Sequence, residues 1–271
     1  MMKIRDWIDI DKMNSFALSM NPNSMDFLKQ NKNKIKWIAL TFNINAIELL
    51  KQNQDKINWN SLSYNPNAME LLKQNINKIN WYNLSANPNA IELLKKNKDK
   101  INWNALSENQ NAISLLKENK NKINWDCVST NKNAIELLKE NQDKINWVRL
   151  SKNSNAISLL KENPNKINWD YLSKNPNPNA ILLLKENPNK INWNFLSENP
   201  NAISLLKENQ DKINWYHFSK NPNIFTYDYK KIKEKMKNSG IFEELMAFIF
   251  HPRNMNKWFG LGHDEFMDFI N

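Results

Sequence analysis

Glycine, cysteine and histidine are all scarce in this sequence of 271 residues, which contains three, one and three of them. So few glycines exclude a Gly-rich phosphate loop and a dinucleotide fingerprint, because both need several glycines at fixed offsets. The single cysteine, Cys127, excludes an internal disulfide and a cysteine zinc site, which is typical of a reducing compartment. These absences remove several classes of enzyme from consideration.

Long apolar runs are also missing, and the N-terminal segment MMKIRDWIDIDK is charged throughout. The sequence therefore predicts neither a membrane span nor a secretory signal peptide, and we expect a protein that is not secreted. A hydrophobic content of 41% with 11% aromatic residues is enough to build a core, which argues against disorder.

A repeat dominates the sequence. One unit has the pattern K-I-N-W-x-x-L-S-x-N-P-N-A-I-x-L-L-K-x-N, and a degenerate first unit has Ser15 in the tryptophan place. About ten units run from Met13 to Asn223. The spacing of the tryptophans is 22 residues throughout, except for 24 before the eighth of them, and they are Trp37, Trp59, Trp81, Trp103, Trp125, Trp147, Trp169, Trp193 and Trp215.

Each unit has the pattern of two short helices. In residues 57–75, Asn58 suits an N-cap, and Asn65-Pro66 is a second helix start because proline is tolerated in the first turn. The apolar residues that follow form one stripe, and Asn75 is a candidate left-handed C-cap. Such short helices are marginal alone, so we expect them to persist by stacking on neighbouring units.

These features predict an all-α solenoid, an open rod or arc of roughly 80–100 Å with tryptophan and leucine columns inside. We expect an N-terminal leader or cap (residues 1–12), the repeats (residues 13–223) and a helical C-terminal cap (residues 224–271). In the tail, DYKKIKEKMKNSG suggests a helix that ends at Gly240, and an apolar helix over IFEELMAFIF would cover the last repeat together with Trp258 and Phe266. A leucine-rich-repeat horseshoe is the alternative fold, although the strand pattern LxL is missing.

The repeat INWxxLSxNPNAIxLLKxN, with a tail containing HPRNMNKW and LGHDEF, resembles repeat-containing proteins that occur in many copies in giant DNA viruses of the mimivirus type. The resemblance covers nearly the whole chain. It implies a viral source, a repeat scaffold, and a location in the host cell cytoplasm or the virion. It implies no catalytic activity.

No constellation typical of catalysis was found in the sequence. His251, His263 and Asp264 are the best candidates for a metal site, but twelve residues separate the two histidines and no other ligand pattern supports them. We therefore predict no enzyme activity, no catalytic or metal residues, no cofactor and no small-molecule substrate.

The net charge of +10 lies entirely in residues 1–223 and comes from two lysine columns, Lys51 to Lys207 and Lys34 to Lys212. A lysine ladder along a rod could follow a phosphate backbone, so weak, salt-dependent nucleic-acid binding is the alternative function. Against it, the chain has only three arginines, and glutamates follow many lysines of the first column.

The positions at which the units differ are the informative ones for binding. The residue two past each tryptophan is expected opposite the core, and the residue one past it on the flank. Large aromatic residues and an arginine gather in these two columns, as in binding hot spots. The predicted function is a non-enzymatic scaffold for an unidentified host or viral protein, and the predicted partner-binding residues are Tyr82, Arg149, Tyr171, Phe195, Tyr216 and His217.

Overall fold

The computed structural model describes residues 2–241, 244 and 247. The chain divides into two compact units, one of residues Asp6–Ile224 and one that combines Met1–Arg5 with Phe225–Asn271. The first contains the repeats and is all-α, as the sequence predicts.

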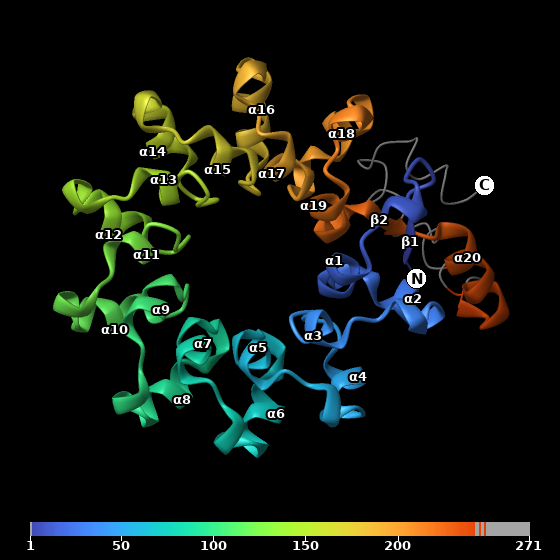
Figure 1. Ribbon diagram of the computed structural model, residues 1–271, viewed down its shortest axis with the longest axis horizontal. Helices are drawn as coiled ribbons and strands as arrows, with labels where there is room; N and C mark the ends of the chain where they lie inside the picture. Colours follow the sequence, from blue (N-terminus) through green and yellow to red (C-terminus); the bar gives the residue numbers. More distant parts are fainter. Residues whose placement is uncertain (1, 242–243, 245–246, 248–271) are drawn as a thin grey trace. The chain divides into compact units, whose positions relative to one another are not determined.

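The repeats place their first helices on an inner circle and their second helices on an outer circle (Figure 1). The inner helices are α1 (Ser15–Met20), α3 (Trp37–Leu40), α5 (Trp59–Tyr64), α7 (Trp81–Ala86), α9 (Trp103–Glu108), α11 (Trp125–Val128), α13 (Trp147–Leu150), α15 (Trp169–Ser173), α17 (Trp193–Ser197) and α19 (Trp215–Lys220). The outer helices are α2 (Met25–Gln30), α4 (Ile47–Lys51), α6 (Met69–Gln74), α8 (Ile91–Lys96), α10 (Ile113–Glu118), α12 (Ile135–Lys139), α14 (Ile157–Glu162), α16 (Pro178–Glu186) and α18 (Ile203–Glu208). Single 3-10 turns join many of them.

Asparagine side chains begin these helices as the sequence predicts, but they end them differently. Asn58 accepts from the backbone N–H of Ser61 at the start of α5, and Asn65 accepts from Asn67 at the 3-10 turn that leads into α6. The prediction of a left-handed cap at Asn75 is wrong, because its φ is −130°. Its side-chain amide instead donates to the carbonyl of Leu71, which satisfies a free helix end without backbone strain.

The hydrophobic core lies between the inner and outer helices. One leucine of most inner helices, such as Leu62 and Leu106, is fully buried, and Val128 and Phe218 take this place in α11 and α19. The tryptophans are only half-buried, so the prediction that they lie inside is partly wrong. They stand at the first position of each inner helix, where a lysine ammonium of the next unit covers the ring, as Lys78 covers Trp59 at 4.4 Å.

Neighbouring units are joined by a ladder of buried asparagines, each the first asparagine of the N-x-N motif (often NPN) of its unit. The amide of Asn109 donates to the carbonyls of Ser85 (3.0 Å) and Asn87 (2.7 Å) in the unit before it. Ser85 contributes a second link, because its hydroxyl accepts from the backbone N–H of Asn102. The same bonds recur from unit to unit, and burial makes them costly to lose.

The first unit joins the tenth through the same contacts, so the repeats close into a ring. Helix α1 packs against α19, and the amide of Asn21 donates to the carbonyls of Ser219 (3.0 Å) and Asn221 (2.8 Å). The backbone N–H of Asn14 donates to the hydroxyl of Ser219, and Lys12 lies over the Trp215 ring. The predicted open rod or arc is therefore wrong. The first repeat covers the exposed end of the last one.

The two extra residues before Trp193 lengthen α16 without disturbing the ladder. Helix α16 begins at Pro178 and projects outward from the outer circle (Figure 1). The amide of Asn199 still reaches the carbonyls of Ser173 and Asn175 in the unit before it. The insertion is thus absorbed in the outer helix, and the inner ladder is kept.

The second compact unit contains strands β1 (Met2–Ile4) and β2 (Phe225–Tyr227), which pair antiparallel, and helix α20 (Tyr229–Asn238). The predicted helix over DYKKIK is confirmed as α20, and Gly240, with a φ of 73°, follows its end. The predicted covering role of IFEELMAFIF, Trp258 and Phe266 falls outside the described residues, apart from isolated positions, as do His251, His263 and Asp264.

Candidate binding surface on the inner face of the ring

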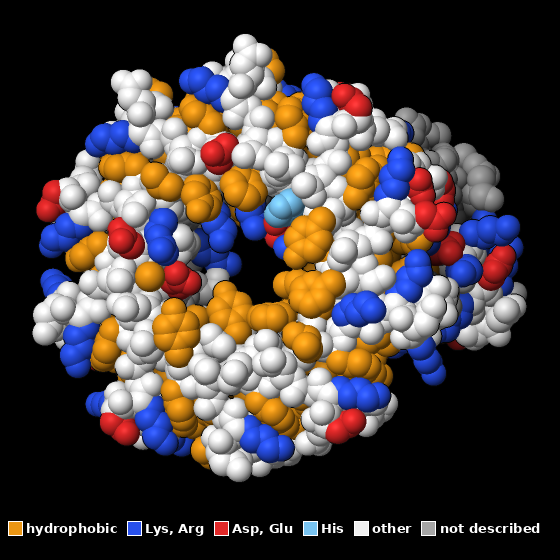
Figure 2. Space-filling view, viewed as in Figure 1, with side chains coloured by type: hydrophobic (Ala, Val, Ile, Leu, Met, Phe, Trp, Pro, Cys, Tyr) orange, Lys and Arg blue, Asp and Glu red, His pale blue; other side chains and the backbone are white. Residues whose placement is uncertain are grey.

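An opening passes through the middle of the ring, and hydrophobic side chains border much of its edge (Figure 2). We call this opening the lumen. The inner helices surround it, and their tryptophans, leucines and serines are turned toward the core or the next unit. The residue two past each tryptophan lies on the remaining side of the helix. The residue five past it lies on the same face where the helix continues that far, and in the turn after the helix elsewhere.

The prediction that the second column after tryptophan is exposed is wrong for its small members. Ala39, Ser61 and Ala105 are buried, with exposures of 0%, 9% and 5%. The column faces inward in a closed ring, so the adjacent inner helices cover small side chains there. In this column, only side chains larger than alanine or serine extend past the adjacent inner helices into the lumen.

Four of the six predicted partner-binding residues come together on three adjacent inner helices. Tyr171 stacks on Phe195 with ring centroids 5.9 Å apart, and His217 meets the edge of Phe195 at 6.2 Å. Tyr216 contacts His217 at 5.5 Å. We call Tyr171, Phe195, Tyr216 and His217 the aromatic row. Tyr82 lies apart from it on α7, with 59% of its surface exposed.

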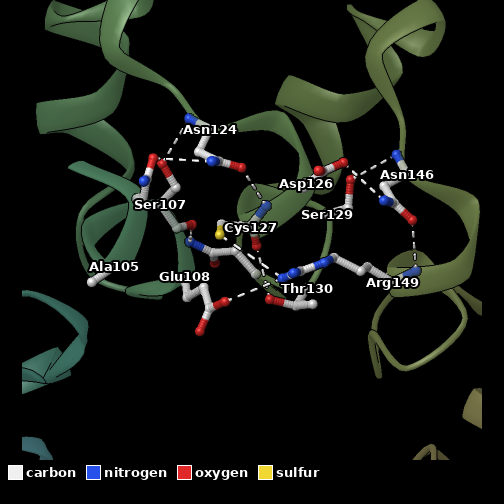
Figure 3. A network of polar contacts seen from close by, with 12 residues as sticks. Ala105, Ser107, Glu108, Asn124, Asp126, Cys127, Ser129, Thr130, Asn146 and Arg149 are labelled. Carbon is white, nitrogen blue, oxygen red and sulfur yellow. Dashed lines mark hydrogen bonds and ion pairs between the residues drawn. The ribbon is translucent and has the colours of Figure 1, made fainter. Parts of the chain in front are cut away.

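Arg149, the sixth predicted residue, reaches across two units instead of joining the aromatic row (Figure 3). Its guanidinium lies 3.4 Å from the Glu108 carboxylate and 3.8 Å from the Cys127 sulfur. Burial, followed by the charge of Glu108, raises the pKa of the Cys127 thiol. The thiol therefore stays protonated at neutral pH, which is unlike an activated nucleophile.

A second polar cluster adjoins the aromatic row. Glu198 accepts from Lys174 at 2.9 Å and lies 3.3 Å from the His217 ring nitrogen. Burial alone would raise the pKa of Glu198, but the hydrogen bond and charge of Lys174, with help from Lys220 and His217, hold this pKa below its usual value. Glu198 is therefore ionised at neutral pH, and it orients His217 beside Phe195.

The sequence prediction missed the column five past each tryptophan, which we call the lumen column. It contains Met20, Phe42, Tyr64, Ala86, Glu108, Thr130, Lys152, Lys174, Glu198 and Lys220. Its members influence one another over two units. Burial and then the charge of Glu108 raise the pKa of Tyr64, whereas the charge of Glu108 opposes the lowering of the Lys152 pKa by burial and by Lys174. The signal was present in the sequence: this position is as variable as the second column and three residues from it.

The two lysine columns lie away from the lumen and have partners nearby. Eight lysines from Lys56 to Lys212 lie 4.4–4.8 Å above the tryptophan of the preceding unit. In the outer helices, Lys51, Lys95 and Lys139 pair with a glutamate three residues earlier. Because the repeats form a ring, the lysine columns follow a circle and do not form the straight ladder along a rod that nucleic-acid binding would use.

Among the residues that the structure describes, no group of three or more His, Cys, Asp or Glu side chains is placed to hold a metal ion. In the same part of the chain, no helix is both long and apolar enough to cross a membrane. The features of the inner face that could bind a ligand are the aromatic row, the ion pairs of Glu108 and Glu198, and the variable lumen column. Comparison of the chain with protein-family models, with curated proteins and with solved structures finds no match, so an inference of function has to rest on this inner face.

Proposed function

We propose that this protein is a non-enzymatic scaffold that binds a partner protein on the inner face of its ring. The observation that carries the proposal is the aromatic row, in which four side chains from α15, α17 and α19 contact one another in sequence. Tyr171 and Tyr216 keep 38% and 42% of their surface exposed. Exposed aromatic groups held by their neighbours are typical of interface hot spots, because little entropy is lost on binding.

The contrast between invariant and variable positions supports the same function. Leucine, serine and asparagine columns repeat because they build the core and the ladder. The aromatic row and the lumen column vary from unit to unit, although they share one face. In repeat proteins such a face is where binding residues collect.

The lysines already contact tryptophan rings or glutamates, and this favours a protein partner over nucleic acid. The regular column from Lys56 to Lys212 lies over tryptophan rings, and several outer lysines pair with glutamates. Following the resemblance to giant-virus proteins, we propose a host or virion protein as the partner.

The proposal predicts that partner capture depends on the aromatic row. The immobilised full-length protein should retain a defined set of proteins from the cells in which it is naturally made. Tyr171→Ala combined with Phe195→Ala should lower that retention strongly, since each hot-spot side chain contributes about 2 kcal/mol, roughly 30-fold in affinity. Retention is measured by quantitative mass spectrometry.

The matched control is Ile76→Ala combined with Leu182→Ala, which removes apolar side chains that are 51% and 55% exposed outside the inner face. This variant should retain the same proteins as the unmodified chain. Equal retention by all three proteins would contradict a partner site on the inner face.

A further inference from the structure

The lumen column changes character halfway around the ring. Its first part is apolar or aromatic and contains Met20, Tyr64 and Ala86 at the ends of α1, α5 and α7, and Phe42 in the turn after α3; Phe42 and Tyr64 keep 39% and 49% of their surface exposed. Its second part, Glu108 to Lys220, is mainly charged. We call these two parts of the column the apolar wall and the charged wall, and the aromatic row lies on the same inner helices as the charged wall.

The charged wall has an excess of positive charge. With Arg149, its cations are Lys152, Lys174 and Lys220, and its anions are Glu108 and Glu198. Arg149 pairs with Glu108 and Lys174 with Glu198, while the Lys220 ammonium lies 4.4 Å above the Tyr216 ring.

Lys152 differs from these three cations because its side chain makes no direct contact of this kind with the described residues, although the charges of Glu108 and Glu198 act on it from beyond ion-pair distance. Its side chain has no ion pair and no hydrogen bond with the residues that the structure describes. Its pKa is lowered, first by partial burial among the inner helices and then by the nearby charge of Lys174. Lys152 is nevertheless accessible to solvent, which fits a side chain that points into the lumen. An anion placed here would relieve the repulsion between the two ammonium groups.

The lumen is wide enough for one chain segment. Ten inner helices spaced about 8–10 Å apart lie on a circle of roughly 13–16 Å radius. Subtracting a helix half-width of about 5–6 Å leaves roughly 15–20 Å across, which large side chains narrow further. An extended strand or a single helix of about 10–12 Å fits, whereas a folded domain of 100 residues, with a radius of gyration near 13 Å, does not.

We propose that the lumen binds an amphipathic acidic peptide segment of the partner protein. Its carboxylates lie against Lys152 and Lys174, and its apolar side chains lie against Phe42 and Tyr64. This inference rests on the proposed function and names the chemical class of the partner.

The test uses fluorescein-labelled synthetic peptides of equal length and the full-length protein, with binding followed by fluorescence anisotropy. One peptide has leucines on one helical face and glutamates on the other, the second replaces the glutamates with lysines, and the third replaces the leucines with serines. We expect the Glu/Leu peptide to bind at least about tenfold more tightly than either of the others, because only it matches both walls.

Two charge reversals decide where that peptide binds. Lys152→Glu should weaken binding of the Glu/Leu peptide by about tenfold or more, because it places a like charge against the glutamates. Lys185→Glu makes the same change on the exposed surface of α16 and should alter binding less than about twofold, since exposed charges are screened by salt. The Lys152 side chain makes no hydrogen bond or ion pair with the described residues, so the variant should keep the melting temperature of the unmodified protein.

Equal binding of all three peptides, or equal effects of the two reversals, would overturn this inference. Tighter binding of a thymidine oligonucleotide that is lost in Lys152→Glu would overturn it in favour of nucleic acid. If the Tyr171/Phe195 variant loses partner capture while no acidic peptide binds, the peptide inference fails and the proposed scaffold function stands. If the acidic peptide binds the lumen but the Tyr171/Phe195 variant captures the partner as well as the unmodified protein does, the peptide inference stands and the aromatic row is not the partner site.

Discussion

Replacing Asn21 with alanine should destabilise the protein as much as replacing Asn109, although only Asn109 has a repeat before it in the sequence. Each amide donates to two buried carbonyls of the unit behind it, and for Asn21 that unit is the tenth. Loss of either side chain leaves buried carbonyls without a partner, at a cost of about 3 kcal/mol. Urea unfolding followed by far-ultraviolet circular dichroism measures both values.

Asn111→Ala is the control, because Asn111 is exposed and its amide makes one bond, to the carbonyl of Pro88. It should cost less than about 1 kcal/mol. In an open arc, Asn21 would have no unit behind it, and Asn21→Ala would cost only its local cap on Asn23, about 1 kcal/mol. A clearly smaller effect at Asn21 than at Asn109 would therefore argue against closure.

Phe218→Ala should cost about 3–5 kcal/mol, the usual range for a large aromatic side chain removed from a core. Phe218 is fully buried in α19, and its ring lies 5.8 Å from Trp7 and 5.7 Å from Trp215. Its removal leaves a cavity next to the junction of the first and last units. Thermal and urea unfolding of the purified variant give the measurement.

Phe195→Ala removes the same side chain from the lumen and serves as the comparison. Phe195 is half-buried and stacks mainly on Tyr171, so its loss should cost about 1 kcal/mol. The two variants thus separate stability from binding: the first should lower the melting temperature, the second partner capture. Equal destabilisation by both would mean that the aromatic row is part of the core.

Much of the repeat fold could be predicted from the sequence because it is local. Asn58 and Pro66 start helices where their chemistry requires it, and Gly240 follows α20 with a positive φ. The conformation of Asn75 was harder to predict. An asparagine can end a helix either by adopting a left-handed backbone conformation or by donating its side-chain amide to a helix carbonyl. Only the structure distinguishes the two.

Closure of the ring could not be predicted, because it depends on a turn of about 36° per unit that no single residue encodes. One signal was nevertheless present. Lys12, just before the first repeat, and Asn14 and Asn21 within it correspond to the residues that reach back to a preceding unit in the other repeats, although residues 1–11 contain no repeat. The lumen column was missed for the same reason, since its importance appears only when ten variable positions converge.

Distances between spin labels on α1 and its two neighbours test ring closure most directly. With Cys127 replaced by serine, one protein carries labels at Phe16→Cys and Ile38→Cys, on the sequential neighbours α1 and α3. A second carries them at Phe16→Cys and Tyr216→Cys, on α1 and α19. All three positions are exposed and equivalent in register. A closed ring predicts the same short distance for both pairs, near the spacing of adjacent helices of about 10 Å plus the label arms. A distance of several tens of ångströms for the α1–α19 pair alone would contradict closure, as expected of an open arc roughly 80–100 Å long.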